Sequence, residues 1–280
     1  MTKVGILHPG EMGSSIGACA RQGGAEVFWA SAGRGPDTHR RADEAGLVAL
    51  EGLGALTTSV DIIVSVCPPH AARDVAHATV AAGFDRIYVD GNAVSPDTAR
   101  DVAKIVRHNG CEYVDGGIIG PPALRPGGTR MYLSGDGAGK VAELFQGSNL
   151  NVIDLGPGDA AASALKMCYA SWTKGTSALL LAIRTLARSE GVDEALVQEW
   201  SGSQSGLAER SQRAARGSSR KAWRFVGEML EIAHSFEAAG LPGGFHRGAA
   251  ELYEHLSEFK DADKAPTLEE VVATLLREHE

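Results

Sequence analysis

A short apolar segment runs directly into a glycine-containing turn near the start of the chain. Lys3 to Leu7 has the apolar and β-branched residues of a strand, and Met12 to Gly23 has the small residues of a closely packed helix. A turn between a first strand and a first helix exposes backbone amides, and these amides can bind the diphosphate of a dinucleotide. The segment therefore predicts an α/β fold with a nucleotide site at this turn.

The turn departs from the usual glycine fingerprint G-x-G-x-x-G. His8 stands where the first glycine is expected, whereas Gly10 and Gly13 keep the other two positions. Gly10 lets the backbone approach a diphosphate, and Gly13 allows the helix to pack closely on the strand. An ordinary strand–helix turn remains the alternative. The residues predicted to bind the cofactor here are His8, Pro9, Gly10, Glu11, Met12 and Gly13.

Further apolar runs alternate with helix-like stretches over the first half of the chain. Continuous apolar strands interleaved with helices predict a parallel, doubly wound sheet. The expected strands are Glu26 to Trp29, Asp61 to Val66, Arg86 to Val89, a strand beginning at Tyr113 and Val114, Arg130 to Leu133, and Asn151 to Leu155. We expect a Rossmann-type domain over residues 1–158.

The pattern changes after Gly158. Asp159 to Glu190 lacks proline and is rich in helix-forming residues, so it predicts one long helix that Asp159 would cap. Shorter helices are expected over Asp193–Trp200, Gly206–Arg216, Arg220–Ala239, Phe245–Phe259 and Thr267–His279. The expected fold is therefore α/β with a long interdomain helix and an all-α domain over residues 159–280.

The ends of successive predicted strands carry further candidates for the cofactor. The second strand is followed by Ser31 and Arg34 instead of a carboxylate, which favours NADP over NAD because a guanidinium binds a phosphate well. Arg34 as a solvated loop cation is the alternative. Val66, Cys67 and Pro68 follow the next strand, and Asn92 follows the one after.

Charge and cysteine usage exclude several classes of protein. Lys plus Arg is 27 and Asp plus Glu is 35, so the net charge of −8 disfavours nucleic-acid and anionic membrane partners. No apolar run approaches the roughly 20 residues of a transmembrane helix, and the first residues show no signal-peptide pattern. Four scattered cysteines indicate a reducing, cytoplasmic location. No metal site is expected, since His234, His246 and His255 include no pair spaced i, i+4 on a helix.

With these residues in hand, the chain resembles the β-hydroxyacid dehydrogenase superfamily, which includes 6-phosphogluconate and 3-hydroxyisobutyrate dehydrogenases. The resemblance covers nearly the whole chain and is closest to a bacterial branch with a phosphogluconate dehydrogenase-like helical domain. It rests on the motifs HPGEMG, SVCPPH, DGNAVSP, DGGIIGPP and ALKM–YASWTKG. It implies a Rossmann domain, a long interdomain helix, and a helical domain that often makes an intertwined dimer, so we expect a homodimer.

The resemblance places the family's catalytic lysine at Lys166. This lysine follows a glycine-rich turn and lies among Ala164, Leu165, Met167 and Cys168, an unusual setting for a lysine. Partial burial lowers the pKa of a lysine toward neutral pH, which suits general acid–base catalysis. A lysine reaching out from the helix surface is the alternative.

The substrate-binding motifs depart from the family pattern. The family loop D-x-P-V-S-G-G corresponds to a loop beginning at Asp115, with Ile119 in place of the serine, and the family asparagine after the lysine corresponds to Ala170. Backbone amides of the loop can still bind a carboxylate or carbonyl group. The expected substrate-binding residues are Gly116, Gly117, Ile118 and Ile119 on the loop, and Tyr169, Thr173 and Lys174 on one face of the long helix.

These observations predict an enzyme that transfers hydride reversibly between NADP(H) and a small hydroxy acid or related carbonyl compound. Lys166 is the expected general acid and base. One alternative is an imine reductase with the same cofactor, favoured by Tyr169 and the apolar Ile118-Ile119 pair. A second is a non-catalytic NADP-binding sensor or scaffold, because a fold does not guarantee catalysis.

Overall fold

The computed structural model describes residues 1–277, which divide into two compact units, one from Met1 to Met167 and one from Cys168 onward. The division lies inside the long helix α7 (Ala161–Ser189). The sequence predicts the boundary earlier, after residue 158, where the helical pattern begins. The difference has a physical reason: Ser163, in the first turn of α7, is hydrogen-bonded to Asp115 of the sheet and belongs to the first unit.

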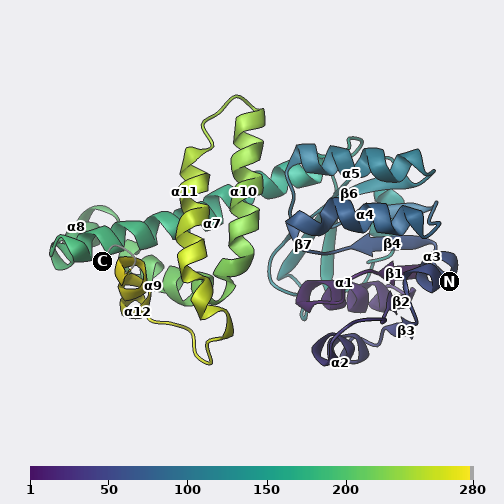
Figure 1. The fold of residues 1–280 in the computed structure, drawn as a ribbon, viewed down its shortest axis with the longest axis horizontal. Helices are drawn as coiled ribbons and strands as arrows, with labels where there is room; N and C mark the ends of the chain where they lie inside the picture. Colours follow the sequence, from purple (N-terminus) through teal and green to yellow (C-terminus); the bar gives the residue numbers. More distant parts are fainter. Residues whose placement is uncertain (278–280) are drawn as a thin grey trace. The chain divides into compact units, whose positions relative to one another are not determined.

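A β-sheet forms the centre of the first unit, as Figure 1 shows, and it contains eight strands. The strands lie in the order β3-β2-β1-β4-β5-β6-β7-β8, and all neighbours are parallel except the antiparallel pair β6–β7. The strands are β1 (Lys3–Ile6), β2 (Glu26–Ala30), β3 (Val48–Leu50), β4 (Ile62–Ser65), β5 (Ile87–Asp90), β6 (Glu112–Ile119), β7 (Thr129–Ser134) and β8 (Leu150–Asp154). The doubly wound fold expected from the sequence is confirmed.

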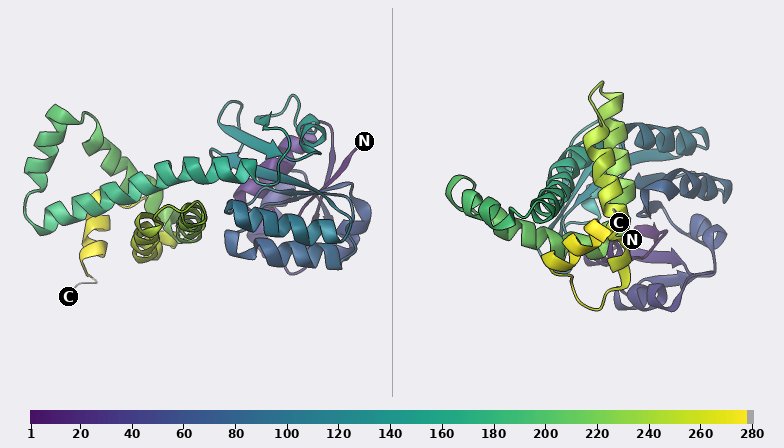
Figure 2. Two further views of the ribbon diagram at one scale, coloured as in Figure 1. Left: turned by 90° about the horizontal axis from the view of Figure 1, so that it is seen from above. Right: turned by 60° about the vertical axis from the view of Figure 1, so that its left-hand side comes forward.

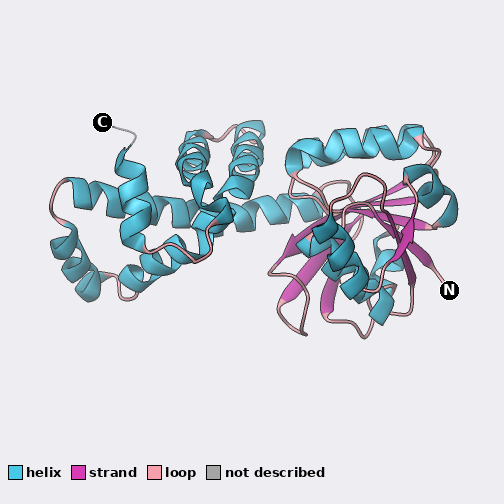
Figure 3. Cartoon of the chain, turned by 60° about the horizontal axis from the view of Figure 1, so that its bottom comes forward, coloured by secondary structure: helices cyan, strands magenta, loops and turns pink. Residues whose placement is uncertain are grey.

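Helices cover both faces of this sheet (Figures 2 and 3). One face packs against α1 (Glu11–Gln22), α2 (Pro36–Glu44) and α6 (Ala138–Glu143). The other face packs against α3 (Leu53–Ser59), α4 (Ala72–Ala81) and α5 (Pro96–His108), with a short 3₁₀ turn, η1 (Pro69–Ala71), before α4. Because both faces are buried, the central strands are apolar at nearly every position.

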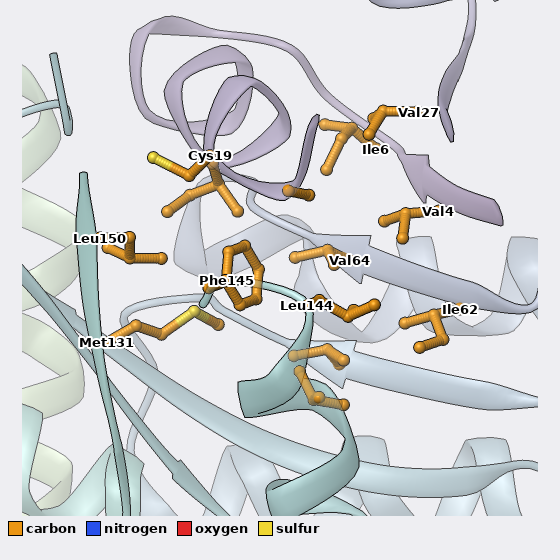
Figure 4. Packing of buried hydrophobic residues seen from close by; sticks show 14 of the residues in the cluster. Val4, Ile6, Cys19, Val27, Ile62, Val64, Met131, Leu144, Phe145 and Leu150 are labelled. Atoms are coloured by element: carbon orange, nitrogen blue, oxygen red, sulfur yellow. The ribbon is translucent and has the colours of Figure 1, made fainter. Parts of the chain in front are cut away.

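Alternate residues of each strand enter opposite cores. Ile62 and Val64 of β4 lie in the core beneath α1, which Figure 4 shows, whereas Ile63 between them lies in the core beneath α4 and α5. Phe145, which follows α6, packs into the first of these cores. Because β1, β4 and β5 pair in parallel, their carboxyl ends lie along one edge of the sheet, where the candidate cofactor residues follow.

Strand β3 is absent from the sequence-based prediction. It has only three residues, and two of them, Val48 and Ala49, are exposed. A strand this short gives no periodic signal. Its pairing with β2 nevertheless extends the sheet on the side that carries Ser31.

The second unit is helical, as expected. The predicted helix Thr267–His279 corresponds to α12, and His279 lies outside the described residues. Among the described residues, no helix combines the length and hydropathy needed to cross a membrane. Besides the rest of α7, the unit contains α8 (Asp193–Ser203), α9 (Leu207–Ser218), η2 (Ser219–Lys221), α10 (Ala222–Ala238), α11 (Gly244–His255), η3 (Leu256–Asp261) and α12 (Leu268–Arg277).

Candidate active site

The turn between β1 and α1 leaves the helix N-terminus open. Gly10 occupies the N-cap position and makes no side-chain cap bond, and a side chain at Gly10 would meet no atom within 4 Å. A Cβ atom at Gly13, in contrast, would lie 2.1 Å from the carbonyl oxygen of His8. Gly13 is therefore required by the close path of the backbone. The backbone N–H of Gly10 itself donates to the carbonyl oxygen of His8 at 2.8 Å. The N–H groups of the first turn of α1, which follow Gly10, fit the diphosphate of a dinucleotide.

His8 is a neutral imidazole at this turn. Burial and the charge of Arg34 lower its pKa from 6.5 to about 4. Its Nδ1 atom is buried and has no hydrogen-bond partner among the described residues. His8, which stands in place of the family glycine, thus adds a buried polar atom beside the turn.

The loop after β2 carries Ser31 and the exposed Arg34. The Ser31 hydroxyl donates to the carbonyl oxygen of Leu50 in β3 at 2.9 Å, and the backbone N–H of Arg34 donates to the carbonyl oxygen of Ser31 at 3.2 Å. The missed strand β3 therefore fixes the position of this loop. The exposed guanidinium of Arg34 and the lone pairs of the Ser31 hydroxyl are available to a phosphate.

Asn92 ties together the loops that follow β4 and β5. Its side-chain oxygen accepts from the backbone N–H of Cys67 at 2.6 Å, and its amide group donates to the hydroxyl of Ser65 at 3.3 Å. Burial and the charge of Asp90 raise the pKa of the Cys67 thiol to about 12, so this group is a neutral thiol. Val66 packs in part against the core, and Pro68 is exposed. Asn92 shapes this edge with its side chain, which is already satisfied within the protein.

Lys166 lies in the second turn of α7 with its amine against the sheet. Its Nζ atom donates to the carbonyl oxygen of Ile118 at 2.7 Å. Burial of the side chain lowers the pKa of the amine from 10.5 to about 8. An amine with this pKa can both accept and donate a proton near neutral pH.

The start of α7 differs from the prediction. The carboxylate of Asp159 does not cap the helix, because both its oxygens bind the guanidinium of Arg107 at 2.6 Å. The backbone N–H groups of Ala161 and Ala162 instead donate to the hydroxyl of Ser134 at 3.2 Å. Ser134 of β7, which is remote in sequence, thus replaces the local cap. The order of residues alone does not reveal this replacement.

The predicted substrate loop is also corrected. Gly116, Gly117, Ile118 and Ile119 belong to strand β6 and pair with β7, so most of this segment is sheet. Its other neighbour, β5, ends at Asp90, which pairs with Asp115, so the backbone beyond Asp115 has a strand on one side only. The two glycines hid the strand because glycine is rare in strand interiors. A Cβ atom at Gly117 would lie 2.5 Å from the carbonyl oxygen of Ala162, and this close approach explains the glycine.

Tyr169, Thr173 and Lys174 belong to the helical unit. Tyr169 is exposed, and the hydroxyl of Thr173 donates to the carbonyl oxygen of Tyr169 at 3.2 Å. The ammonium of Lys174 forms an ion pair with Glu228 and lies 4.7 Å from the ring centre of Phe225. In this structure the charge of Lys174, which the sequence analysis assigns to an anionic substrate, faces the carboxylate of Glu228. The described residues contain no group of three side chains suited to a metal ion.

Comparison with known proteins agrees with this geometry. Residues 3–146 match the family model described as the NAD binding domain of 6-phosphogluconate dehydrogenase, and residues 187–256 match a domain of unknown function, DUF1932. The chain belongs to the β-hydroxyacid dehydrogenase superfamily. An uncharacterized 28.5 kDa protein of Methanothermus fervidus is 30% identical over 199 residues, which are 70% of this chain and 75% of that protein.

Solved structures of this superfamily share the fold over nearly the whole chain. A conserved protein of unknown function, described as similar to 3-hydroxyacid dehydrogenases, is 26% identical with a TM-score of 0.69, covering 92% of this chain and 98% of its own. A Mycobacterium tuberculosis 3-hydroxyisobutyrate dehydrogenase is 16% identical with a TM-score of 0.71 and 99% of both chains covered. A reductive aminase of Aspergillus terreus is 18% identical with a TM-score of 0.55, covering 98% of both chains. These likenesses show the fold. The family match is what supports an NAD(P)-dependent oxidoreductase.

Proposed function

We propose that this superfamily member transfers hydride reversibly between NADP(H) and a small hydroxy acid or related carbonyl compound. The observation that carries the proposal is the amine of Lys166, which is partly buried, has a pKa of about 8 and is held on the carbonyl oxygen of Ile118. The same compact unit carries the open turn of His8 to Gly13.

Each residue of the site has a defined task. The bound nicotinamide supplies the hydride donor or acceptor. In the oxidative direction, the neutral amine of Lys166 takes the hydroxyl proton of the substrate. In the reductive direction, its ammonium form returns a proton to the carbonyl oxygen. The carbonyl group of Ile118 holds the amine in place.

The preference for NADP is tested by titrating the protein with NADPH and with NADH while following tryptophan fluorescence. We expect NADPH to bind more tightly, because the exposed guanidinium of Arg34 can pair with a 2′-phosphate. Arg34→Ala should raise the Kd for NADPH about tenfold, the value for a hydrogen bond between charged groups. It should leave the Kd for NADH nearly unchanged.

Arg40→Ala provides the matched control for this titration. Arg40 is also a surface arginine near the same loop, but it is paired with Asp37 and Glu44. Failure to bind either cofactor would overturn the proposal. Tight binding without turnover of any hydroxy acid, carbonyl compound or imine would instead favour a cofactor-binding sensor or scaffold.

An imine reductase is the second candidate. It is favoured by the apolar Ile118-Ile119 pair, in which Ile119 stands where the superfamily motif has a polar serine, and by the exposed Tyr169. The fold shared with a reductive aminase is consistent with this candidate. A screen of cyclic imines beside keto acids and semialdehydes, with NADPH consumption as the readout, separates the two reactions.

We further propose that the protein is a homodimer joined through the helical unit. A stripe of apolar side chains remains exposed along α7: Trp172 and Leu186 are both 63% exposed, Leu179 is 42% exposed, and Tyr169 is 46% exposed. Trp172, Leu179 and Leu186 follow one another at intervals of seven residues, or two helical turns, so they share one face of the helix. Exposed apolar faces of this kind mark protein–protein contacts.

Sedimentation velocity of the Leu179→Glu variant tests this assembly. We expect the wild-type protein to sediment as a dimer and the variant as a monomer, because a charge within an apolar contact has no partner. Leu124→Glu is the control, since Leu124 is an exposed apolar residue of the first unit. A wild-type monomer at micromolar concentration would refute the dimer.

A further inference from the structure

Three polar side chains meet in the interior where α7 begins. Asp115, Ser134 and Ser163 are almost fully buried, with exposed fractions of 0%, 0% and 1%. One oxygen of Asp115 accepts from the hydroxyl of Ser163 at 2.6 Å, and the other accepts from the backbone N–H of Ser163 at 2.8 Å and from the hydroxyl of Ser134 at 3.2 Å. The carboxylate is therefore satisfied by groups from two other elements, β7 and α7.

These bonds attach the first turn of α7 to strand β6. Ser163 precedes Lys166 by three residues and so lies beside it on the helix face. Along the strand, Asp115 precedes Ile118 by three residues, and the carbonyl oxygen of Ile118 accepts from Lys166. The helix and the strand are thus joined twice, once by the buried carboxylate and once by the lysine amine.

Gly117 lies between these two connections, at a point where β6 and α7 are too close for a side chain. A Cβ atom there would lie 2.5 Å from the carbonyl oxygen of Ala162 and 3.2 Å from Cβ of Lys166. Close backbone packing makes the position of the Lys166 side chain sensitive to small shifts of the helix. Asp159, the local candidate for a cap, is engaged by Arg107 instead, so the first N–H groups depend on Ser134 and Asp115.

We propose that Asp115, Ser134 and Ser163 are positioning residues that set the rotation and axial position of α7 and thereby hold the Lys166 amine on the carbonyl oxygen of Ile118. This inference rests on the proposed role of Lys166 as the general acid and base. None of the three residues touches the substrate in this assignment. They act through the helix.

A second buried carboxyl group, that of Asp90, lies next to Asp115. The two residues are opposite each other in β5 and β6. Burial and the charge of Asp115 raise the pKa of Asp90 to about 7. Burial raises the pKa of Asp115 as well, to about 6, whereas its hydrogen bonds from Ser163 and Ser134 oppose this rise. The donors of the helix start thus favour negative charge on Asp115.

The test follows the reactivity of Lys166 in the cofactor-bound protein and in the free protein. We would measure the rate at which an amine-acylating reagent modifies Lys166 as a function of pH, by mass spectrometry of the peptide, together with kcat. In Ser163→Ala we expect the pKa of Lys166 to rise from about 8 toward the pKa of an exposed lysine, about 10.4. We expect kcat to fall about 10- to 100-fold, as for a displaced catalytic group, with an unchanged Kd for NADPH.

Two further variants make the test specific. Ser163→Thr keeps the hydroxyl and should retain the wild-type titration of Lys166. Thr79→Ala is the matched control, because Thr79 is a buried residue of α4 whose hydroxyl donates to the carbonyl oxygen of Val75 at 2.7 Å, remote in sequence from α7. If Ser163→Ala fails to fold, Ser134→Ala carries the same measurement, since it leaves both bonds between Asp115 and Ser163 in place.

An unchanged titration of Lys166 in the serine-to-alanine variants would overturn the positioning role, as would an equal change in Thr79→Ala. Failure of the proposed function is recognised separately. If Lys166→Ala leaves turnover intact, the lysine is not the acid and base, but the modification profile still reports whether the three residues hold its amine. The two results are therefore independent.

Discussion

Replacing Lys166 by alanine lowers kcat by about 10²- to 10⁴-fold, the usual contribution of a positioned general acid or base. The methyl side chain can neither take the hydroxyl proton nor return it to the carbonyl oxygen. Binding of NADPH should survive, because the amides at the turn of His8 to Gly13 are unaffected. Steady-state kinetics with a substrate found by screening, together with a fluorescence titration of NADPH, measures both effects.

The pH dependence of turnover gives this prediction a specific signature. With a pKa of about 8, Lys166 is increasingly neutral above that pH, so the rate of oxidation should rise through pH 8 and then level off. The rate of reduction should fall over the same range, because it needs the ammonium form. Both limbs should be absent from Lys166→Ala, whereas the control Lys104→Ala, at a largely exposed lysine, should behave as wild type. Unchanged turnover in Lys166→Ala would refute the assignment.

Replacing Arg184 by alanine should reduce the free energy of unfolding by about 3–5 kcal/mol, the usual cost of removing one partner of a buried ion pair. Arg184 of α7 is 5% exposed, and its guanidinium donates to both carboxylate oxygens of Asp193 at 2.6 and 2.9 Å. It also donates to the hydroxyl of Ser211 at 2.8 Å, which joins α7, α8 and α9. The variant leaves Asp193 with Arg188 alone, at 2.8 Å.

Urea unfolding followed by far-ultraviolet circular dichroism measures this effect, because helices dominate the signal. Arg40→Ala is the control: its ion pairs with Asp37 and Glu44 are exposed, so no measurable change in the midpoint is expected. Arg184→Lys keeps the charge but loses the two parallel hydrogen bonds to Asp193. Its urea midpoint should therefore lie between those of the wild type and of Arg184→Ala. A midpoint for Arg184→Ala equal to that of the wild type would contradict a stabilising role for this cluster.

The elements that sequence reasoning located correctly are those with a strong local signal. Strands β4 and β5 are continuous apolar runs because both faces of a parallel sheet are buried, and α7 is a long segment without proline. Lys166 was recognisable as a lone charge in an apolar stretch of helix. Its contact with Ile118 and its lowered pKa agree with that expectation.

The errors fall where the local signal is weak or misleading. Strand β3 is too short to show a period. The glycines of β6 suggest a loop, because the close approach of Gly117 to α7 depends on a segment distant in sequence. Asp159 has the side chain and the place of a helix cap, but Arg107 of another helix binds it. Lys174 likewise finds a carboxylate, Glu228, that is far away in the sequence.

The sequence by itself determined the doubly wound fold, the glycine turn for a dinucleotide and the candidate lysine, because burial period and turn chemistry are local properties of the chain. Only the tertiary structure decided how α7 begins. The hydrogen bonds of Asp115 and Ser134 to the helix join residues about 30 to 50 positions apart. Buried polar groups must find partners wherever the fold places them, so such pairings follow from the packed interior and not from residue order.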